Sequence, residues 1–372
     1  MSLIKLSISK CLLYLLIISI LRTMNDIIYA QKKKYFDNPL FSNFLMFIGE
    51  SLSIILYLYQ NYSNKYKTKI EFMIQKSTKF FLVLLMFISS FCDFLASFSY
   101  NHLYNYKMKT IDETLTKNFG GIVLFICFYL NEKYFLNIKT YRHHYIGIGI
   151  NLIPLISFLL YYFIENKNLQ YNLSLVYLLI IELERNYLLT IWFIICKKLN
   201  YQYFLNMNLI LFIVGIFGIL IVIVFHFLNL GIFKIEKFYL FNFEGNNHFS
   251  ISDFIILFMN CVLICLLNIY YLKVVEETRP IYNSLSKGLS NIFIDISHLI
   301  QYFFLKNNNY NKVLDFQNVI LKTFALIGFL IYSEMITLNF CDLDKFTKIK
   351  TADRGEEDNR TINDLNLSTF SF

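Results

Sequence analysis

The chain has 372 residues, of which 56% are apolar and only 16% are charged, and its formal net charge at pH 7 is +8. Soluble globular proteins are typically about 45–50% apolar and about 25% charged, so this composition argues against a soluble protein. The apolar excess lies in repeated blocks of about 20 residues, the length that a helix needs to cross a hydrocarbon core of about 30 Å. Most of these blocks lack the polar face that a core helix of a soluble protein would show.

The apolar blocks predict an all-α integral membrane protein with about ten transmembrane helices. In chain order the predicted spans cover about residues 6–29, 38–60, 80–104, 111–130, 143–164, 172–196, 205–228, 251–272, 280–304 and 313–338. The loops between them are short, and residues 341–372 are polar and charged, which is typical of a disordered tail. We therefore expect one ten-helix domain over 1–340, with halves of about 1–170 and 171–340, followed by this tail.

The first span also has some features of a signal peptide, because Lys5 and Lys10 precede an apolar run over 11–21. The apolar block continues to Ala30, however, which is long for the apolar part of a signal peptide and favours a retained helix. Lys and Arg are more numerous in the N-terminus, the tail and the loops after even-numbered helices than in the other loops. The positive-inside rule then places both termini in the cytosol.

Charged side chains recur inside these spans and predict surfaces that turn away from lipid. A charge at the centre of the bilayer costs about 2.5–3.5 kcal/mol on insertion scales, so such residues usually face a partner or a cavity. Local pairing is one explanation, and three pairs have the three- or four-residue spacing that lets side chains meet on a helix: Arg22 with Asp26, Glu113 with Lys117, and Glu182 with Arg185.

The ninth span carries a polar stripe in which Asn283, Lys287, Asn291 and Asp295 recur every four residues. Side chains at this spacing lie along one side of a helix. A stripe this polar is expected to face either a solute pathway or a polar contact between helices, and the sequence leaves both open.

The fourth and ninth spans share a short internal repeat. Residues 114–123 read TLTKNFGGIV and residues 284–293 read SLSKGLSNIF, so both contain a hydroxyl–Leu–hydroxyl–Lys core. Each segment lies fourth in a half of five helices, and an odd number of helices inverts the second half in the membrane. Inverted repeats are typical of secondary transporters, with the binding site at the repeat interface near the midplane.

Such a repeat would bring Lys117 and Lys287 to related positions in one cavity. Two ammonium groups there favour an anionic or polar solute, because each charge interaction strengthens on desolvation. The candidate cavity residues predicted from the spans, the stripe and the repeat are Asp93, Ser97, Glu113, Thr116, Lys117, Asn118, Asn283, Ser286, Lys287, Asn291 and Asp295.

Two further segments carry a resemblance to a known family. The second span contains FLMFIGE over 44–50, and the third contains FCDFLASFSYNHLY over 91–104. Together with the helix number, these segments resemble the drug/metabolite transporter superfamily, and within it the F-type, EamA-like branch of solute carrier family 35. The sequence departs from that pattern at Lys117, where the family usually has an arginine, and where Phe, Tyr and Ser replace small residues.

The resemblance implies exchange or facilitated movement of a metabolite, such as a nucleotide sugar or another organic anion, across an intracellular membrane of the ER, Golgi or a vacuolar organelle. The alternative is a membrane-embedded scaffold or chaperone with a transporter-like fold and no transport activity. No clustered catalytic or metal-binding set points to an enzyme, and His248 with Asp253 reads as a chance pattern. We expect no cofactor and no nucleic acid; the partners are a small-molecule solute and the lipid bilayer, with a homodimer left open.

Overall fold

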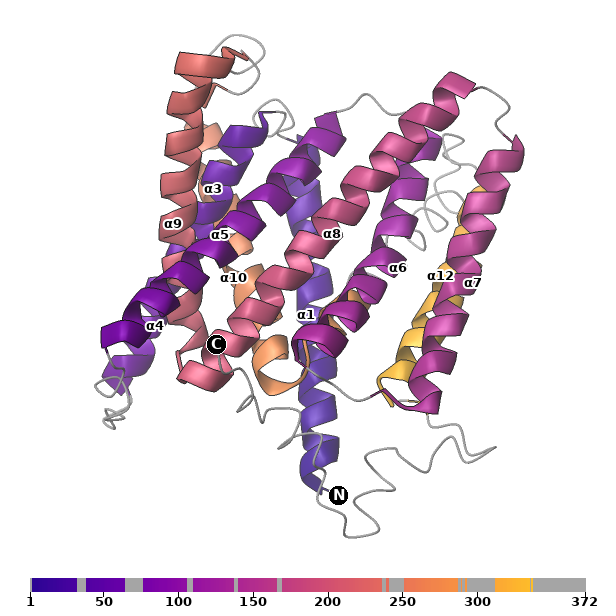
Figure 1. Cartoon of the computed structure of the whole chain (residues 1–372), viewed down its shortest axis with the longest axis horizontal. Helices are drawn as coiled ribbons and strands as arrows, with labels where there is room; N and C mark the ends of the chain where they lie inside the picture. Colours follow the sequence, from indigo (N-terminus) through magenta and orange to yellow (C-terminus); the bar gives the residue numbers. More distant parts are fainter. Residues whose placement is uncertain are drawn as a thin grey trace. The chain divides into compact units, whose positions relative to one another are not determined.

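The computed structural model describes residues 2–31, 38–63, 76–105, 110–136, 140–165, 169–235, 239–240, 251–286, 289, 292, 312–334 and 336. Within these ranges the regular structure is helical throughout (Figure 1). The helices are α1 Ser2–Gln31, α3 Pro39–Ser51, α4 Ser53–Ser63, α5 Lys76–Asn105, α6 Thr110–Phe135, α7 Arg142–Glu165, α8 Leu169–Tyr203, α9 Met207–Leu228, the π-helical turn η2 Asn229–Phe233, α10 Ile251–Glu277 and α12 Lys312–Tyr332.

Four helical stretches in the described part of the chain are long and apolar enough to cross a membrane. They are Pro39–Gln60, Phe80–Ser99, Met207–Phe233 and Ile251–Glu277. The chain is therefore a helical membrane protein, as its composition predicts. Most of the ninth predicted span and the whole tail of 341–372 lie outside the described residues.

Two predicted helices have different ends in the structure. The second predicted span is divided at Leu52 into α3 and α4. The Ser51 hydroxyl, 2.7 Å from the Ile48 carbonyl, offers the backbone a competing hydrogen bond at this point. The tenth predicted span ends at Tyr332 rather than 338, because Glu334 adopts a left-handed backbone with φ of 62° that no α-helix can continue.

The described helices form two compact units, each of which combines segments from both halves of the sequence. The first unit comprises Met1–Ser19, Met108–Leu183 and Thr278–Phe372. The second unit comprises Ile20–Lys107 and Glu184–Glu277.

In the second unit, α3 packs against α9, α10 and α5. The start of α3 is fixed by Asn38, whose side-chain oxygen accepts hydrogen bonds of 3.0 Å from the amides of Leu40 and Phe41. Phe47 of α3 and Phe94 of α5 are buried together in an apolar cluster with residues of α9. These contacts hold the middle of α3 against its neighbours.

In the first unit, α7 packs along α12, and both helices contact α6. The α7–α12 contact is a close approach of two backbones at Gly147 and Gly328. A Cβ atom added to Gly147 would lie 2.6 Å from the Gly328 carbonyl oxygen and 2.8 Å from the Tyr332 amide nitrogen. Small residues allow membrane helices to approach in this way, so Gly147 and Gly328 permit the close packing of α7 against α12.

Gly147→Ala is therefore expected to destabilise the first unit by about 1–3 kcal/mol, because the added methyl group must push two backbones apart. Gly149 supplies a matched control on the same helix, since a Cβ atom there would meet nothing within 4 Å. The measurement is the apparent melting temperature of both variants in detergent. Equal melting temperatures for Gly147→Ala and Gly149→Ala would contradict the close contact.

Candidate functional site

A buried acidic site lies in the second unit, where three helices that are candidate membrane spans each supply one polar residue. Glu50 comes from α3, Asp93 from α5 and Asn268 from α10. Glu50 is fully buried and Asp93 is 5% exposed. The side-chain amide of Asn268 donates a hydrogen bond of 2.7 Å to Oε1 of Glu50. We call Glu50, Asp93 and Asn268 the carboxyl site.

Close packing of α3 against α10 places Glu50 in this position. The neighbouring residue is Gly49, and a Cβ atom there would lie 2.6 Å from the Cys261 carbonyl oxygen of α10. A larger side chain would therefore separate the two helices and carry Glu50 away from Asn268. On α5, the next residue after Asp93 is Phe94, which is buried in the apolar cluster and fixes the helix locally.

The two carboxyl groups of the site lie close enough to influence each other. The charge of Asp93 acts on the carboxyl group of Glu50. Among the described residues, no donor reaches the buried Oε2 of Glu50 or the buried Oδ2 of Asp93. A hydrogen bond between two carboxyl groups requires a proton on one of them, since two ionised groups would repel each other. A proton on one of the two groups would remove this repulsion.

A further buried amide lies on the same side of α3 as the carboxyl site. Asn43 precedes Glu50 by seven residues, which is close to two helical turns. Its side chain is fully buried, and neither of its polar atoms has a hydrogen-bond partner in the described part of the chain. Buried polar atoms are nearly always bonded, so Asn43 marks a second point on this helix face that can receive a polar ligand.

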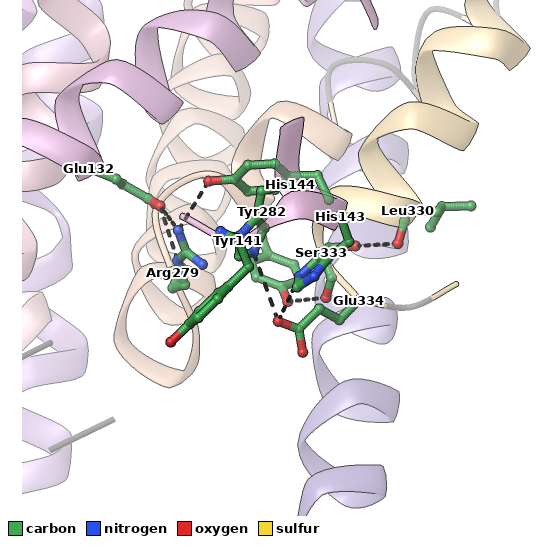
Figure 2. Close-up of polar contacts among 10 residues, drawn as sticks. Glu132, Tyr141, His143, His144, Arg279, Tyr282, Leu330, Ser333 and Glu334 are labelled. Carbon is green, nitrogen blue, oxygen red and sulfur yellow. Dashed lines mark hydrogen bonds and ion pairs between the residues drawn. The ribbon is translucent and has the colours of Figure 1, made fainter. Parts of the chain in front are cut away.

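A second polar cluster lies in the first unit, where the ends of several helices meet (Figure 2). Glu132, near the end of α6, is fully buried. Its Oε2 accepts hydrogen bonds from Nε and Nη2 of Arg279 at 3.0 and 2.5 Å, and its Oε1 accepts one of 2.7 Å from the Ile281 amide. Arg279 also donates a hydrogen bond of 3.3 Å to the Tyr332 hydroxyl at the end of α12.

The charge of Arg279 is maintained by its partner. Burial alone would lower the pKa of the Arg279 guanidinium, but the Glu132 carboxylate, aided by Tyr332, reverses this effect and raises the pKa above its usual value. Arg279 therefore stays cationic at every pH at which the protein is folded. The ion pair ties the segment after α10 to α6 through contacts that a neutral residue could not supply.

Two adjacent histidines in the first turn of α7 meet the carboxylate of Glu334, just beyond α12. Nε2 of His143 and of His144 lie 3.3 and 3.8 Å from Oε1 of Glu334. Figure 2 shows both rings beside this carboxylate. The Tyr332 ring lies between this group and the ion pair, since it contacts both His144 and Arg279.

Three segments that are far apart in the sequence form this cluster. Glu132 follows the fourth predicted span, Arg279 follows the eighth, and Glu334 lies near the end of the tenth. The structure brings them together. The sequence predicts all three on one side of the membrane, and both the alternation of the spans and the cytosolic assignment of this side stay predictions.

The residues of the predicted cavity have different placements. Asp93 belongs to the carboxyl site, whereas the Ser97 hydroxyl donates to the Asp93 carbonyl at 2.5 Å and is bound within its own helix. Asn283 and Ser286 are buried in the first unit, where the Ser286 hydroxyl donates to the Asn283 carbonyl at 2.7 Å. Glu113, Thr116, Lys117 and Asn118 lie on α6 with side chains outside the described part, and Lys287, Asn291 and Asp295 lie outside the described residues.

Glu50 and Asn268 are not among the predicted cavity residues. Glu50 was visible as a charge in an apolar span, which was a usable signal, but Asn268 is a neutral amide among apolar residues. Comparison with protein-family models gave no match for this chain, and comparison with curated proteins gave none either.

Proposed function

We propose that this protein is a secondary transporter that moves a polar, anionic metabolite together with a proton. The observation that carries the proposal is the Glu50–Asp93 pair, two buried carboxyl groups on helices that are candidate membrane spans. Ionisable residues inside a membrane are expensive to insert, and carboxyl groups are retained there chiefly in proton relays and solute pathways.

The chemistry of the carboxyl site supports proton coupling. One proton bound between Glu50 and Asp93 leaves the pair with a single negative charge, and a second proton makes it neutral. Each protonation step changes the charge that is buried at the site. It therefore changes the relative free energies of conformations in which the site is buried and conformations in which it is open to water. A proton that enters with an anionic solute also reduces the net charge that must cross the membrane.

The expected substrate class and architecture rest on the sequence. The shared core around Lys117 and Lys287 supports an anionic solute and two inverted five-helix halves. The resemblance to the solute carrier family 35 branch supports a nucleotide sugar or a related organic anion, and an intracellular membrane. Exchange of one metabolite for another and facilitated movement are both compatible with this architecture.

The test is uptake by purified protein in liposomes, with a panel of labelled organic anions that includes nucleotide sugars. We expect saturable uptake of at least one of them, faster when the external medium is more acidic than the lumen. Absence of uptake across the panel would count against transport, and uptake that ignores the proton gradient would count against proton coupling. Unaltered uptake by Lys117→Ala/Lys287→Ala would refute the proposed role of the two lysines.

A cell-based assay separates transport from a scaffold role. A variant that no longer transports in liposomes should also fail to support cells that depend on the protein. Full complementation by such a variant would favour the scaffold alternative.

A further inference from the structure

We propose that His143, His144 and Glu334 form a binding site for a transition-metal ion, with Zn²⁺ as the best fit. These residues lie in the first unit, and the carboxyl site of the proposed function uses none of them. The proposal is independent of the transported solute.

The distances suit direct coordination. One ligand atom from each of the three residues lies within 4.8 Å of the other two. Zn²⁺ binds His nitrogen and carboxylate oxygen at about 2.0–2.2 Å, so neighbouring ligand atoms of a tetrahedral site are separated by about 3.4 Å. The distances from Glu334 Oε1 to Nε2 of His143 and His144 are 3.3 and 3.8 Å. An ion between these atoms would require only small side-chain movements.

The fold holds both histidines in place before any ion arrives. His143 and His144 are both buried at the start of α7. The Tyr141 ring is stacked on His143 at an interplanar angle of 10°, and the Tyr141 amide donates a hydrogen bond of 2.9 Å to Nδ1 of His144. Ligands held in this way lose little side-chain freedom when they bind a metal.

The backbone at Glu334 is an independent indication of a role for its carboxylate. Its φ of 62° lies in the left-handed region, which glycine or asparagine usually occupies at the end of a helix. A non-glycine residue in this conformation is strained, and such strain is concentrated at functional sites. The strained turn directs the carboxylate toward the two histidines.

The metal-free arrangement also leaves a polar atom unsatisfied. Nδ1 of His143 is buried and has no hydrogen-bond partner among the described residues. Since Nδ1 of His144 accepts a hydrogen bond, the proton of that neutral ring lies on Nε2, facing Glu334. A metal ion at Nε2 would move this proton to Nδ1, where it would face the Tyr141 amide, so the His144 ring must turn slightly away from that amide when the ion binds.

The donor set selects the class of ion. Imidazole nitrogens suit Zn²⁺, Cu²⁺ and Ni²⁺, whereas Mg²⁺ and Ca²⁺ prefer sites made of oxygen atoms. Three protein ligands leave a fourth tetrahedral position open for water or another small ligand. A bound ion would join the start of α7 to the end of α12.

The experiment uses the full-length protein in detergent, purified with an affinity tag that contains no histidine. Binding of Zn²⁺ is followed by calorimetry, and binding of Co²⁺ by its visible absorption, which reports the ligand geometry. We expect one ion per chain, with no binding of Mg²⁺ in the same range. His143→Gln and Glu334→Gln should each weaken binding by about 100-fold or more, beyond the effect usual for residues that only support a ligand.

Two controls separate loss of a ligand from loss of structure. His226→Gln removes a histidine from α9 in the second unit and should bind the ion as the wild type does. Glu334→Gly removes the carboxylate but suits the left-handed backbone, so the metal-free variant should be at least as thermostable as the wild type and should still bind poorly. The proposal is overturned if the wild type binds no Zn²⁺, or if Glu334→Gln or Glu334→Gly binds as tightly as His226→Gln.

Discussion

Glu132→Gln is expected to lower the free energy of unfolding of the first unit by about 3–5 kcal/mol, the usual cost of removing one partner from a buried ion pair. Glutamine has nearly the same shape as glutamate, so the loss would not come from a cavity. Its single side-chain oxygen could accept from Arg279 or from the Ile281 amide but not from both, so its NH₂ would face one of these donors and Arg279 would lose its counter-ion. The measurement is equilibrium unfolding in mixed micelles, followed by the loss of helical circular dichroism.

Two further variants show whether the effect belongs to the pair. Lys133→Gln removes the adjacent charge on α6, which lies outside the ion pair, and should change stability by no more than about 0.5 kcal/mol. Glu132→Met/Arg279→Met removes both charges and should recover a large part of the loss, since neutral replacement of both partners is often tolerated. A Glu132→Gln variant as stable as Lys133→Gln would contradict the importance of this pair.

Glu50→Gln/Asp93→Asn is expected to abolish accumulation of the solute against its gradient. A gradient of one pH unit corresponds to a free energy of about 1.36 kcal/mol for each proton that crosses the membrane. A symporter that carries one proton with each solute, without net transfer of charge, can therefore concentrate the solute about tenfold for each pH unit. The amide side chains preserve size and hydrogen bonding but cannot take up a proton. Uptake by the variant should therefore stop at equal concentrations inside and outside, whatever the pH gradient.

The matched control for this experiment is Cys92→Ala. Cys92 is the residue before Asp93 on α5, is buried, and is free of disulfide bonding. The Cys92→Ala protein should accumulate solute as the wild type does, which would show that a substitution next to Asp93 on α5 is tolerated. Proton-driven accumulation by the Glu50→Gln/Asp93→Asn protein would exclude the carboxyl site as the coupling site.

The sequence predicts single helices well because hydropathy is a local property. The expected span of 143–164 corresponds to α7 at Arg142–Glu165, and that of 111–130 lies within α6 at Thr110–Phe135. The division at Leu52 and the early end at Tyr332 were missed, because a serine hydroxyl and a left-handed residue act on the backbone without changing hydropathy.

The candidate sites could be predicted only in part, because they depend on how helices pack. Asp93 stands out as a charge in an apolar span, but its contact with Glu50 depends on the packing of α3 and α5. In the sequence Arg279 looks like an ordinary charged loop residue. Its partner Glu132 lies 147 positions earlier, so only the structure shows that the two form an ion pair. Glu334 is 191 positions from His143, and no spacing rule connects them.

The contact between Gly147 and Gly328 also limits how the first unit can move. Two helices whose backbones touch cannot slide or rotate past each other without a steric clash, so α7 and α12 should move as one rigid body in any conformational change. A covalent tether between their exposed sides would therefore leave turnover intact. Spin labels on the two helices should report a constant distance while other distances in the protein change.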